Sequence, residues 1–503
     1  MSLRKLVIVA AISTVVFCPP AVFSQIATVQ SEDFEAVRTH ILEAVNSGEV
    51  PSISVAVAVD GEVIWEEAFG WANRESLIKA TPHTMYSMAS ISKPITTTGL
   101  MKLVESGKIV LEGSVNEYIS PAKLTAYEGD AEDVSVRHIL NHTSGLPLHY
   151  TCFYFDEPDR LAPPAPESIR RYGIIVNKPG EVYLYSNFAF SLADHIVSKV
   201  SGLSFSEYMK TEVFLPLGMT HTSIDVGPGL EKFPAERYHT DGKPVPFYTS
   251  DHPGASQVFC SAHDLIRFAL FHLKNPLPEQ KKILKEETIS LMQTDSDPNP
   301  ENNRYGLGWF LRADDYGYST VYHTGSMRGV NNILKMVPSE NIAVVVLINT
   351  SSSLRNELPN DIIGILLPDY GEKLKADRDR PSEKTAPFKP VPKLNGKWEG
   401  EITTYENVTP VTFIFQEDGD IHVKIKNQLD TLLNRPRYRD GTLSGICSGT
   451  ISSGDAERFP HDISLRMRLK GNTLSGYVST RFNTERSYGS YSSYIQITKV
   501  DQD

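Results

Sequence analysis

The sequence predicts an α+β domain, an antiparallel sheet flanked by helices, followed by a small all-β domain. Strand-like segments lie near both ends of residues 31–372, with a helix-rich stretch between them. A proline-rich segment follows at residues 373–392, and apolar and polar residues then alternate repeatedly over residues 393–503. A single core stops growing at ~250–300 residues, so a length of 503 residues also favours two folded units.

The composition is that of an ordinary globular protein. Hydrophobic residues make up 40% and charged residues 22% of the chain, which permits a sizeable core. The formal net charge is -12. Nucleic-acid binding depends mainly on Lys and Arg side chains that neutralise phosphates, so we expect no nucleic-acid partner.

The N-terminus has the pattern of an export signal. Arg4 and Lys5 precede an apolar run at residues 6–17, and two prolines follow that run. A membrane span needs ~20 apolar residues, and this run is shorter. We therefore predict that residues 1–24 are a cleaved signal peptide that leaves no stable membrane span, and that the mature protein is periplasmic or extracellular.

Signatures of metal and cofactor binding are missing from the sequence. It contains no His-Glu-x-x-His, no Cys-x-x-Cys and no Gly-x-x-x-x-Gly-Lys phosphate loop, so we expect neither a metal nor a cofactor. Three cysteines remain after signal removal, too few for a disulfide scaffold. We expect Cys152, Cys260 and Cys447 to be buried free thiols without a catalytic role.

The first domain should begin with a helix over residues 34–45, where apolar residues recur at helical spacing before Gly48. Asp60-Gly61 is a typical hairpin turn between two apolar strands. Four strands are predicted near the two ends of the domain, at residues 53–59, 63–69, 330–336 and 342–348. The domain should therefore close its sheet with its own terminal segments.

The second domain is predicted from a change in pattern. Residues 373–392 carry many charges and prolines, a composition that resists helix and sheet, and we assign them as a linker. Beyond the linker, apolar and polar residues alternate at residues 421–426 and 463–469, as in half-buried antiparallel strands. We therefore predict a small β-barrel or sandwich over residues 393–503.

A Ser-x-x-Lys pattern is the candidate for nucleophilic chemistry, and it occurs four times. Only Ser90 and Lys93 stand at the start of a convincing helix, with Pro94 in the first turn, where proline is tolerated. Lysine can activate a serine only if burial or nearby cations remove its proton. Free N–H groups at the helix start would also stabilise an oxyanion. The pattern alone leaves a structural role open.

Further motifs follow in order along the chain. They are Tyr86-Ser-Met-Ala-Ser90-Ile-Ser-Lys93, Arg137-His-Ile-Leu-Asn-His-Thr-Ser-Gly-Leu-Pro147, Tyr185-Ser-Asn187, Pro216-Leu-Gly-Met219 and His323-Thr-Gly325. Together, over about residues 31–367, they resemble the class C β-lactamase and D-Ala-D-Ala carboxypeptidase-related family of serine hydrolases, which is also penicillin-binding-protein-like.

The resemblance implies a catalytic group of three residues. Ser90 would be the acylated nucleophile, Lys93 its base or proton shuttle, and Tyr185 the second proton-transfer group. A free tyrosine has a pKa near ~10, so Tyr185 would need cationic neighbours that lower its pKa, or would act through Lys93. The alternative is that Tyr185 is only a core aromatic residue.

The resemblance also implies a substrate-binding group. Its members are Asn187, His323, Thr324, Gly325 and the backbone N–H of Ser326, which would form an oxyanion hole with the N–H of Ser90. Gly325 would let the substrate approach closely. The alternative for His323 is an ordinary strand residue.

His323 stands where penicillin-reactive members carry lysine. A fixed ammonium there binds the carboxylate of β-lactams and D-Ala-D-Ala, whereas a histidine with a pKa near ~6.5 is mostly neutral at pH 7. The resemblance to members with histidine here, including esterases and aminopeptidases acting on D-residues, favours ester or amide hydrolysis. Arg328 could restore a cation near the pocket, although we expect a solvated loop arginine.

In the second domain, Leu394-Asn-Gly-Lys-Trp398-Glu-Gly400 and the strands after it resemble the lipocalin-like barrels appended to some members. Such a barrel could close the active-site entrance, bind a small apolar ligand or mediate oligomers. The sequence leaves these roles and the oligomeric state open. We expect Trp398 in the barrel core.

The sequence thus predicts a metal-free serine hydrolase that cleaves an ester or amide through an acyl-enzyme on Ser90, as an esterase or D-amino-acid peptidase. A D-Ala-D-Ala carboxypeptidase or a β-lactamase is the alternative. A non-catalytic protein that binds cell-wall fragments or antibiotics is the alternative of another class. The substrate would be a small molecule or a peptide, with the cell wall as one source.

Overall fold

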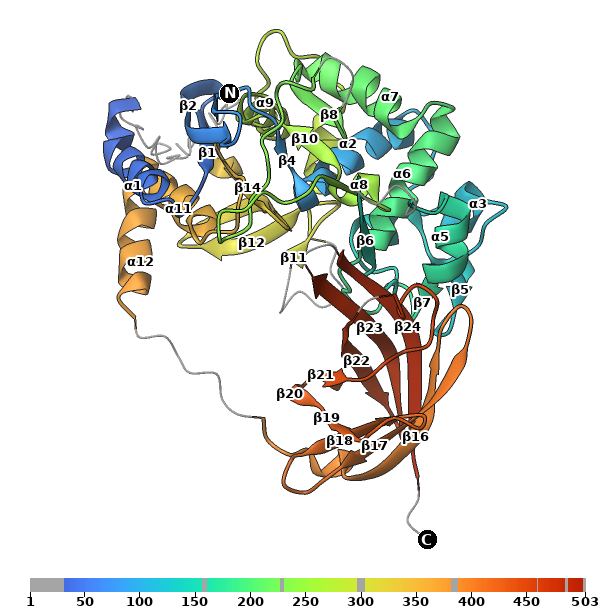
Figure 1. Cartoon of the computed structure of the whole chain (residues 1–503). Coiled ribbons are helices and arrows are strands. Elements are labelled where there is room, and N and C mark those ends of the chain that lie inside the picture. The colour runs from blue at the N-terminus through green and yellow to red at the C-terminus, as the bar shows by residue number, and fades with distance from the viewer. Residues whose placement is uncertain are drawn as a thin grey trace, which may run out of the picture.

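The computed structural model describes residues 31–155, 161–226, 230–295, 304–380, 388–458, 460–484 and 487–500. The predicted signal peptide at residues 1–24 lies outside the described residues. Figure 1 shows a unit of mixed helices and strands above a β-barrel. This arrangement confirms the predicted α+β fold followed by an all-β barrel.

The upper unit holds the first fifteen strands and the described α-helices. Its strands are β1 Ser52–Val59, β2 Glu62–Asn73, β3 Ile78–Lys79, β4 Tyr86–Ser87, β5 Thr125–Ala126, β6 Tyr150–Tyr154, β7 Ile174–Ile175, β8 Thr222–Ile224, β9 Tyr248–Ser250, β10 Val258–Cys260, β11 Arg304–Tyr305, β12 Phe310–Asp315, β13 Tyr318–Met327, β14 Val330–Val337 and β15 Ile342–Ile348. Its helices are α1 Glu35–Asn46, α2 Ser92–Glu105, α3 Val115–Ile119, α4 Val136–Leu140, α5 Ala165–Tyr172, α6 Asn187–Ser201, α7 Phe205–Met209, α8 Pro253–Ser256, α9 Ala262–His272, α10 Glu286–Met292, α11 Leu354–Leu366 and α12 Pro368–Arg378, with a 3-10 helix, η2 Ala89–Ile91, before α2.

The central sheet has the strand order β11-β12-β13-β14-β15-β1-β2-β3. β1 pairs antiparallel with β15, from Ile53 opposite Ile348 to Val59 opposite Ile342. The two ends of the unit therefore meet in the middle of the sheet, as the sequence predicted. Asp60 and Gly61, both with positive φ, form the predicted turn between β1 and β2.

The sheet separates two hydrophobic cores. Every residue of β1 and β15 is buried, because helices cover both faces of the sheet. Ala56 and Ala58 pack into the core that also holds residues of α2, α6 and α9. Val55 and Val57 pack into the core that α1, α11 and α12 cover from the other side. The first core positions the candidate site.

The predicted linker begins inside a helix. The composition of residues 373–392 favours neither helix nor sheet, yet α12 continues to Arg378. Tyr370 and Leu374 are buried in the second core, and tertiary packing of this kind stabilises a helix that its composition alone does not. The expectation of a helix-free segment was therefore wrong for residues 373–378, and the domain boundaries themselves stay a prediction.

The lower unit is a nearly closed antiparallel barrel. Its strands are β16 Gly396–Thr403, β17 Val408–Phe415, β18 Ile421–Ile425, β19 Thr431–Leu432, β20 Asn434–Arg439, β21 Thr442–Ser448, β22 Asp462–Lys470, β23 Thr473–Thr484 and β24 Ser487–Lys499. Inward-facing apolar side chains fill one core. Trp398 belongs to this core, 1% exposed, and its indole N–H donates to the Leu394 carbonyl at 2.7 Å. The core role predicted for Trp398 is confirmed.

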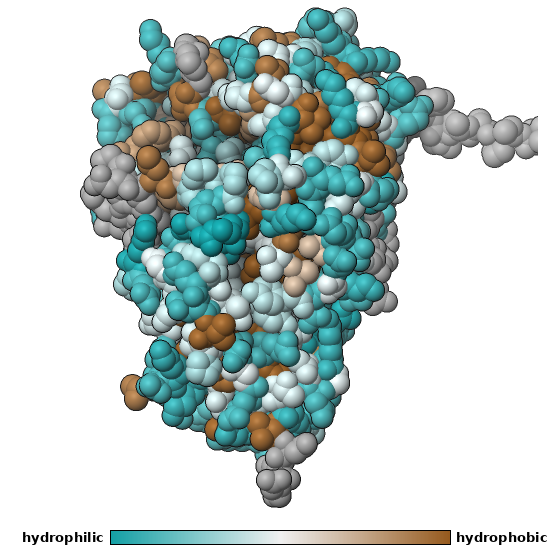
Figure 2. All heavy atoms as spheres, turned by 90° about the vertical axis from the view of Figure 1, so that its right-hand side faces the viewer, coloured by the Kyte–Doolittle hydropathy of each residue, from teal (hydrophilic) through white to brown (hydrophobic). Residues whose placement is uncertain are grey.

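The barrel sheet continues into the upper unit. β24 pairs with β6, with Gly489 opposite Thr151 and Ser490 opposite Tyr150, and β6 pairs in turn with β9. β23 and β24 rise toward the upper unit in Figure 1. Figure 2 shows the two units as one continuous, mostly hydrophilic surface on the side that carries α5 and α7. The barrel is thus attached by backbone pairing as well as by side chains.

One carboxylate at this junction accepts three hydrogen bonds. Asp455 of the barrel accepts from the Arg171 guanidinium at 2.8 Å, from the Tyr172 hydroxyl at 2.5 Å and from the Tyr405 hydroxyl at 2.8 Å. Its side chain is 12% exposed. Charge-assisted bonds of this kind are stronger than neutral ones, so Asp455 is a main polar contact between the two units.

Two further expectations concern the whole chain. The described part of the chain contains no helix that is both long and apolar enough to cross a membrane. Cys152, Cys260 and Cys447 are free and buried, which confirms the burial and the free thiols predicted for them.

Replacing Asp455 by alanine should destabilise the junction. The donors of Arg171 and Tyr172 would lose their acceptor, which typically costs about 1–3 kcal/mol, so thermal unfolding should begin several degrees lower. Glu181→Ala is the matched control, because Glu181 approaches Arg468 only to 3.9 Å and both side chains are exposed. Equal unfolding temperatures for the two variants would contradict the role given to Asp455.

Candidate active site

Ser90 lies in η2, which continues directly into α2 at Ser92. It is thus close to the predicted helix start. In this first turn backbone N–H groups have no intrahelical acceptor. The preceding residue, Ala89, has a φ of 46°, a left-handed conformation that costs a non-glycine residue roughly 1–2 kcal/mol. The fold holds this turn in place, since the Met88 N–H donates to the Val258 carbonyl at 2.7 Å.

Gly325 on β13 packs directly against the turn that carries Ser90. A Cβ atom at Gly325 would lie 2.1 Å from the Met88 carbonyl oxygen. We expected Gly325 to make room for the substrate. The structure shows that glycine is required for the approach of the protein's own backbone, which brings β13 beside Ser90. Its role in substrate approach stays a prediction.

Lys93 is the centre of the site. Its side chain is fully buried, and its ammonium nitrogen contacts three oxygen atoms. Nζ lies 3.2 Å from Ser90 Oγ, 2.7 Å from Asn187 Oδ1 and 3.2 Å from the Ala255 carbonyl oxygen. All three partners are neutral. Burial therefore lowers the pKa of Lys93 well below its ordinary value.

The two carbonyl partners of Lys93 determine what its neutral form can do. Carbonyl oxygens only accept hydrogen bonds, so Asn187 and Ala255 must receive two N–H bonds from Nζ. A neutral amine has two N–H groups and one lone pair. The lone pair then faces Ser90 Oγ, where it can accept the hydroxyl proton, which is the geometry of a general base.

Tyr185 lies beside both Ser90 and Lys93. It forms a side-chain hydrogen bond with Ser90, and its ring centroid lies 4.8 Å from Lys93 Nζ. Burial raises the pKa of Tyr185 above its ordinary value. Burial thus acts against a lowered pKa, one of the two routes left open by the sequence. The route through Lys93 stays a prediction.

The start of α6 positions both Tyr185 and Asn187. Ser186 between them is the N-cap residue, and its hydroxyl accepts from the Ala189 N–H at 3.1 Å and donates to the Pro147 carbonyl at 2.9 Å. A capped helix start fixes the residues on both sides of it. This explains why Tyr185 and Asn187 both reach Lys93.

His323 is buried behind the site, with no exposed surface. Its Nδ1 lies 2.8 Å from the Thr324 carbonyl oxygen, which only accepts, so Nδ1 carries the proton. Nε2 then accepts from the Tyr305 hydroxyl at 3.1 Å. Burial, followed by the charge of Lys93, lowers the pKa of His323 to about 3. Both ring nitrogens are engaged within the protein, and the place of His323 in substrate binding stays a prediction.

Thr324 and Ser326 lie on the opposite face of β13 from Gly325, because side chains alternate along a strand. Thr324 lines a cavity together with Asn356 and Asn360 of α11. Ser326 accepts a hydrogen bond on its hydroxyl from Arg355 of α11. The backbone N–H of Ser326 as an oxyanion donor stays a prediction.

Comparisons with known proteins agree with this geometry. The family described as Beta-lactamase matches residues 37–364. The chain belongs to the beta-lactamase family. Protein flp of Staphylococcus aureus (strain MRSA252) is 28% identical over 328 residues, which are 63% of this chain and 63% of that protein. The chain thus matches less than two thirds of the length of this curated relative.

Solved structures share the fold of this beta-lactamase family member. A class C β-lactamase has a TM-score of 0.57 at 19% identity and covers 71% of this chain and 99% of its own. SurE, solved with D-Leu, has a TM-score of 0.59 at 19% identity and covers 91% of this chain and 99% of its own. The SurE match therefore extends over both units of the fold.

Several site residues of this beta-lactamase family member were not predicted. The Ala255 carbonyl comes from α8, whose Gly254 N–H donates to the buried Asp194 carboxylate at 2.7 Å. Nothing in the sequence indicates that the Ala255 carbonyl contacts Lys93, because the two residues are 162 positions apart. Ala89 could have been found, since it precedes the candidate nucleophile.

Arg328 is not the solvated loop arginine that we expected. It donates to the Tyr154 hydroxyl at 3.0 Å and to the Asn483 amide oxygen of the barrel, and it lies over the Tyr488 ring. The expectation failed because the barrel strands that cover Arg328 are more than 150 positions away in sequence.

The described residues contain no group of three or more His, Cys, Asp or Glu side chains arranged to hold a metal ion. The reactive side chains that the structure does bring together are Ser90, Lys93 and Tyr185.

Replacing Gly325 by alanine should reduce kcat/KM by roughly a hundredfold, the loss typical of one displaced oxyanion donor. The new methyl group would meet the Met88 carbonyl and push β13 away from Ser90. Gly471→Ala is the control, since its Cβ would meet nothing within 4 Å and any strain would stay in an exposed barrel turn. Activity of Gly325→Ala close to that of the control would contradict the packing role.

The activity should rise with pH through the pKa of Lys93. Burial lowers that pKa, so the neutral base forms well below the ordinary lysine value of 10.5, and activity is lost as the pH falls through it. The check is kcat/KM for a neutral ester from about pH 5 to about pH 10. His323→Asn should leave the midpoint unchanged, because His323 is already neutral over this range. A rise in activity only toward the ordinary lysine value of 10.5 would contradict the neutral base.

Proposed function

We propose that the protein is a serine hydrolase that cleaves an ester or amide bond through an acyl-enzyme on Ser90. One observation supports this most strongly: the buried Lys93 amine contacts neutral oxygens and faces the Ser90 hydroxyl at 3.2 Å. A protein that only binds ligands has no need of a nucleophile coupled to a deprotonated amine. The catalytic proposal is therefore preferred to a silent receptor.

Acylation begins when Ser90 Oγ attacks the substrate carbonyl carbon. The Ser90 proton moves to the lone pair of Lys93, which becomes an ammonium. The oxyanion that forms is stabilised by the N–H groups of Ser90 and, as predicted, of Ser326. Because Lys93 is buried, its new charge is held beside this negative charge with little solvent screening.

Collapse of the intermediate requires a proton for the leaving group. Tyr185 is protonated and hydrogen-bonded at Ser90, so its phenol gives a proton to the leaving oxygen or nitrogen. The Lys93 ammonium then returns a proton to the Tyr185 oxygen, and the amine is neutral again. A water molecule next attacks the acyl-enzyme by the same proton transfers in reverse order, and Ser90 is restored.

The neutral His323 favours esters and D-amino-acid amides over substrates that need a fixed cation at this position. With a pKa of about 3, His323 offers no positive charge to a carboxylate. SurE, which shares the fold, was solved with D-Leu. We therefore place esterase or D-amino-acid peptidase activity ahead of D-Ala-D-Ala carboxypeptidase or β-lactamase activity.

Two further features belong to this proposal. The basic and apolar pattern of residues 1–24 supports export to the periplasm or beyond. The antiparallel barrel with Trp398 in its first strand supports a lipocalin-like domain. Both fit a hydrolase that acts on small molecules or peptides outside the cytoplasm.

The substrate class can be tested with three chromogenic compounds: p-nitrophenyl acetate, a D-alanyl p-nitroanilide and nitrocefin. We expect turnover of the ester, measurable turnover of the anilide and weak or no turnover of nitrocefin. Ser90→Ala should abolish the turnover, and Tyr185→Phe should lower it by roughly 10²–10⁴-fold, as expected for a lost proton donor.

A second serine supplies the control for this panel. Ser76 belongs to another Ser-x-x-Lys pattern and is exposed in a polar turn, so Ser76→Ala makes the same chemical change away from the site. This variant should retain wild-type rates. Equal ester rates for wild type and Ser90→Ala would refute the proposal, and fast nitrocefin cleavage would refute the argument from His323.

A further inference from the structure

The segment at residues 141–147 lies alongside the loop that leads to Tyr185. It is the second half of the sequence motif that begins at Arg137. The Gly145 carbonyl accepts from the Val176 N–H at 2.9 Å, just after β7. Gly145 has a φ of 77°, and a Cβ atom there would meet the backbone of the loop. The segment and the loop are therefore packed backbone against backbone.

His142 of this segment binds the backbone on both sides of Tyr185. Its carbonyl oxygen accepts from the Leu184 N–H at 2.7 Å. Its ring nitrogen Nδ1 accepts from the Ser186 N–H at 3.2 Å. The centroid of the His142 ring also lies 4.3 Å from that of the Tyr185 ring. One residue thus contacts Tyr185 and both of its neighbours in sequence.

The hydrogen bond from Ser186 determines the protonation state that His142 must have. A backbone N–H only donates, so Nδ1 carries a lone pair and the proton of the neutral ring is on Nε2. An imidazolium would place a second N–H against that of Ser186, and the bond would be lost. Burial, followed by the charges of Lys93 and His323, lowers the pKa of His142 well below its ordinary value. Nδ1 therefore remains an acceptor when Lys93 becomes an ammonium.

The surroundings of His142 do not suit a residue that transfers protons itself. Its side chain is fully buried. The Nδ1 lone pair is engaged by Ser186, and Nε2 has no hydrogen-bond partner among the described residues. Besides Tyr185, the rings of Tyr305 and Phe190 pack around it, with centroids at 4.8 Å and 5.4 Å. His142 can therefore affect the reaction only through the residues that it holds.

The backbone of His142 is strained. Its φ is 63°, in the left-handed region that residues other than glycine seldom adopt, although Asn, Asp and His occur there more often than most. Strain of this kind persists where the surrounding structure demands it, and it is concentrated at functional sites. Here the conformation lets one residue direct its carbonyl to Leu184 and its ring to Ser186.

We propose that His142 is a positioning residue for Tyr185, and that its Nδ1 acceptor fixes the Tyr185 hydroxyl where it protonates the leaving group. This inference rests on the hydrolase function proposed above and adds a residue to its machinery. General acid catalysis contributes about 10²–10⁴-fold to a rate and requires the donor within hydrogen-bond reach. Loss of His142 should therefore matter most for leaving groups that need a proton.

The test compares two esters with the same acyl group on the full-length protein. Phenyl acetate releases a basic phenolate, which gains from protonation, whereas p-nitrophenyl acetate releases a more acidic phenol that can leave as the anion. The quantity measured is the leaving-group ratio, the kcat/KM for phenyl acetate divided by that for p-nitrophenyl acetate. A merely structural role of His142 would lower both kcat/KM values equally and would not change this ratio.

Three variants of this position separate the acceptor from the backbone conformation. His142→Gly accepts a positive φ but has no acceptor, and it should lower the leaving-group ratio by about tenfold or more, part of what a general acid contributes. His142→Asn also tolerates the left-handed region and places an amide oxygen near the position of Nδ1, so it should keep the ratio close to the wild-type value. His142→Leu has the shape of asparagine without the acceptor, and it decides the question if His142→Gly does not fold.

A double variant tests whether His142 acts through Tyr185. Tyr185→Phe should itself lower the leaving-group ratio, because the proton donor is lost. Adding His142→Gly to Tyr185→Phe should lower the ratio no further, since residues that act as a unit are not additive. A second drop of similar size would show that His142 acts by another route and would overturn the inference.

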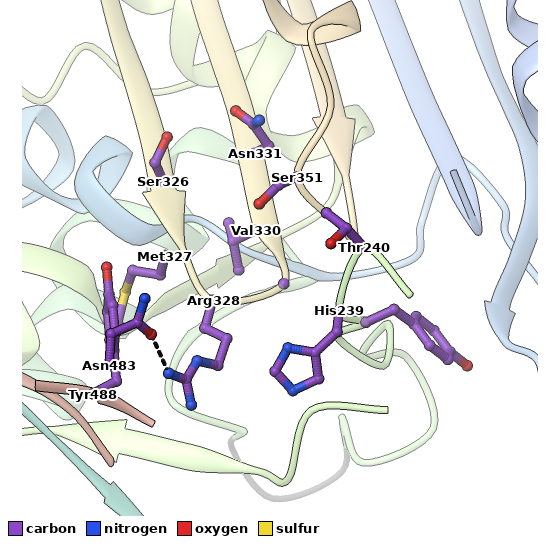
Figure 3. A pocket seen from close by; sticks show the side chains of 12 residues that line it. His239, Thr240, Ser326, Met327, Arg328, Val330, Asn331, Ser351, Asn483 and Tyr488 are labelled. Carbon is purple, nitrogen blue, oxygen red and sulfur yellow. Dashed lines mark hydrogen bonds between the residues drawn. The ribbon is translucent and has the colours of Figure 1, made fainter. Parts of the chain in front are cut away.

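His239→Gly is the matched control, because it makes the same change at a histidine that also lies outside helices and strands. Figure 3 shows the His239 ring near the turn that carries Arg328, at the wall of a cavity of about 350 Å³. No described residue that lines this cavity belongs to residues 141–147 or 176–187. His239→Gly should therefore keep the wild-type leaving-group ratio.

The outcomes separate the two proposals. Ester turnover that survives in Ser90→Ala would overturn the hydrolase function and this inference with it. Turnover that depends on Ser90, with an unchanged leaving-group ratio in His142→Gly and His142→Leu, would overturn only the inference. A ratio in His142→Asn as low as that in His142→Gly would do the same, because the acceptor would then not be the property that matters.

Discussion

The site depends on one buried amine whose hydrogen-bond partners are neutral. Lys93 contacts Ser90, Asn187 and Ala255, and desolvation disfavours its ammonium form. A carboxylate at the same distance would restore the positive charge and remove the base. The surrounding structure therefore has to supply acceptors without supplying an anion, and it does so with one side-chain amide and one backbone carbonyl.

Three separate elements provide this environment. The capped start of α6 fixes Asn187, the short helix α8 presents the Ala255 carbonyl, and β13 packs on the turn of Ser90 through Gly325. All three lie in the upper unit, where helices pack against the sheet. The barrel is linked to the far end of the same strand through Arg328.

Local patterns predicted the features that depend on neighbours in sequence. Alternation indicated the strands β1, β14 and β15, and helical spacing placed Ser90 beside Lys93. Contacts between distant segments were beyond such patterns. The pKa of Tyr185 rises because of burial, the imidazole of His323 is occupied by Tyr305, and Arg328 is covered by barrel residues. Each depends on tertiary packing that a single sequence does not encode locally.

The central claim is that Lys93 is a neutral amine at the pH at which the enzyme works. Its most direct test is an NMR titration of the lysine side chains, with Lys93→Met used to assign the signal. The account predicts one lysine that titrates well below the ordinary value of 10.5 and disappears in the variant. If the Lys93 signal titrated with the exposed lysines instead, the proposed base and the mechanism built on it would be wrong.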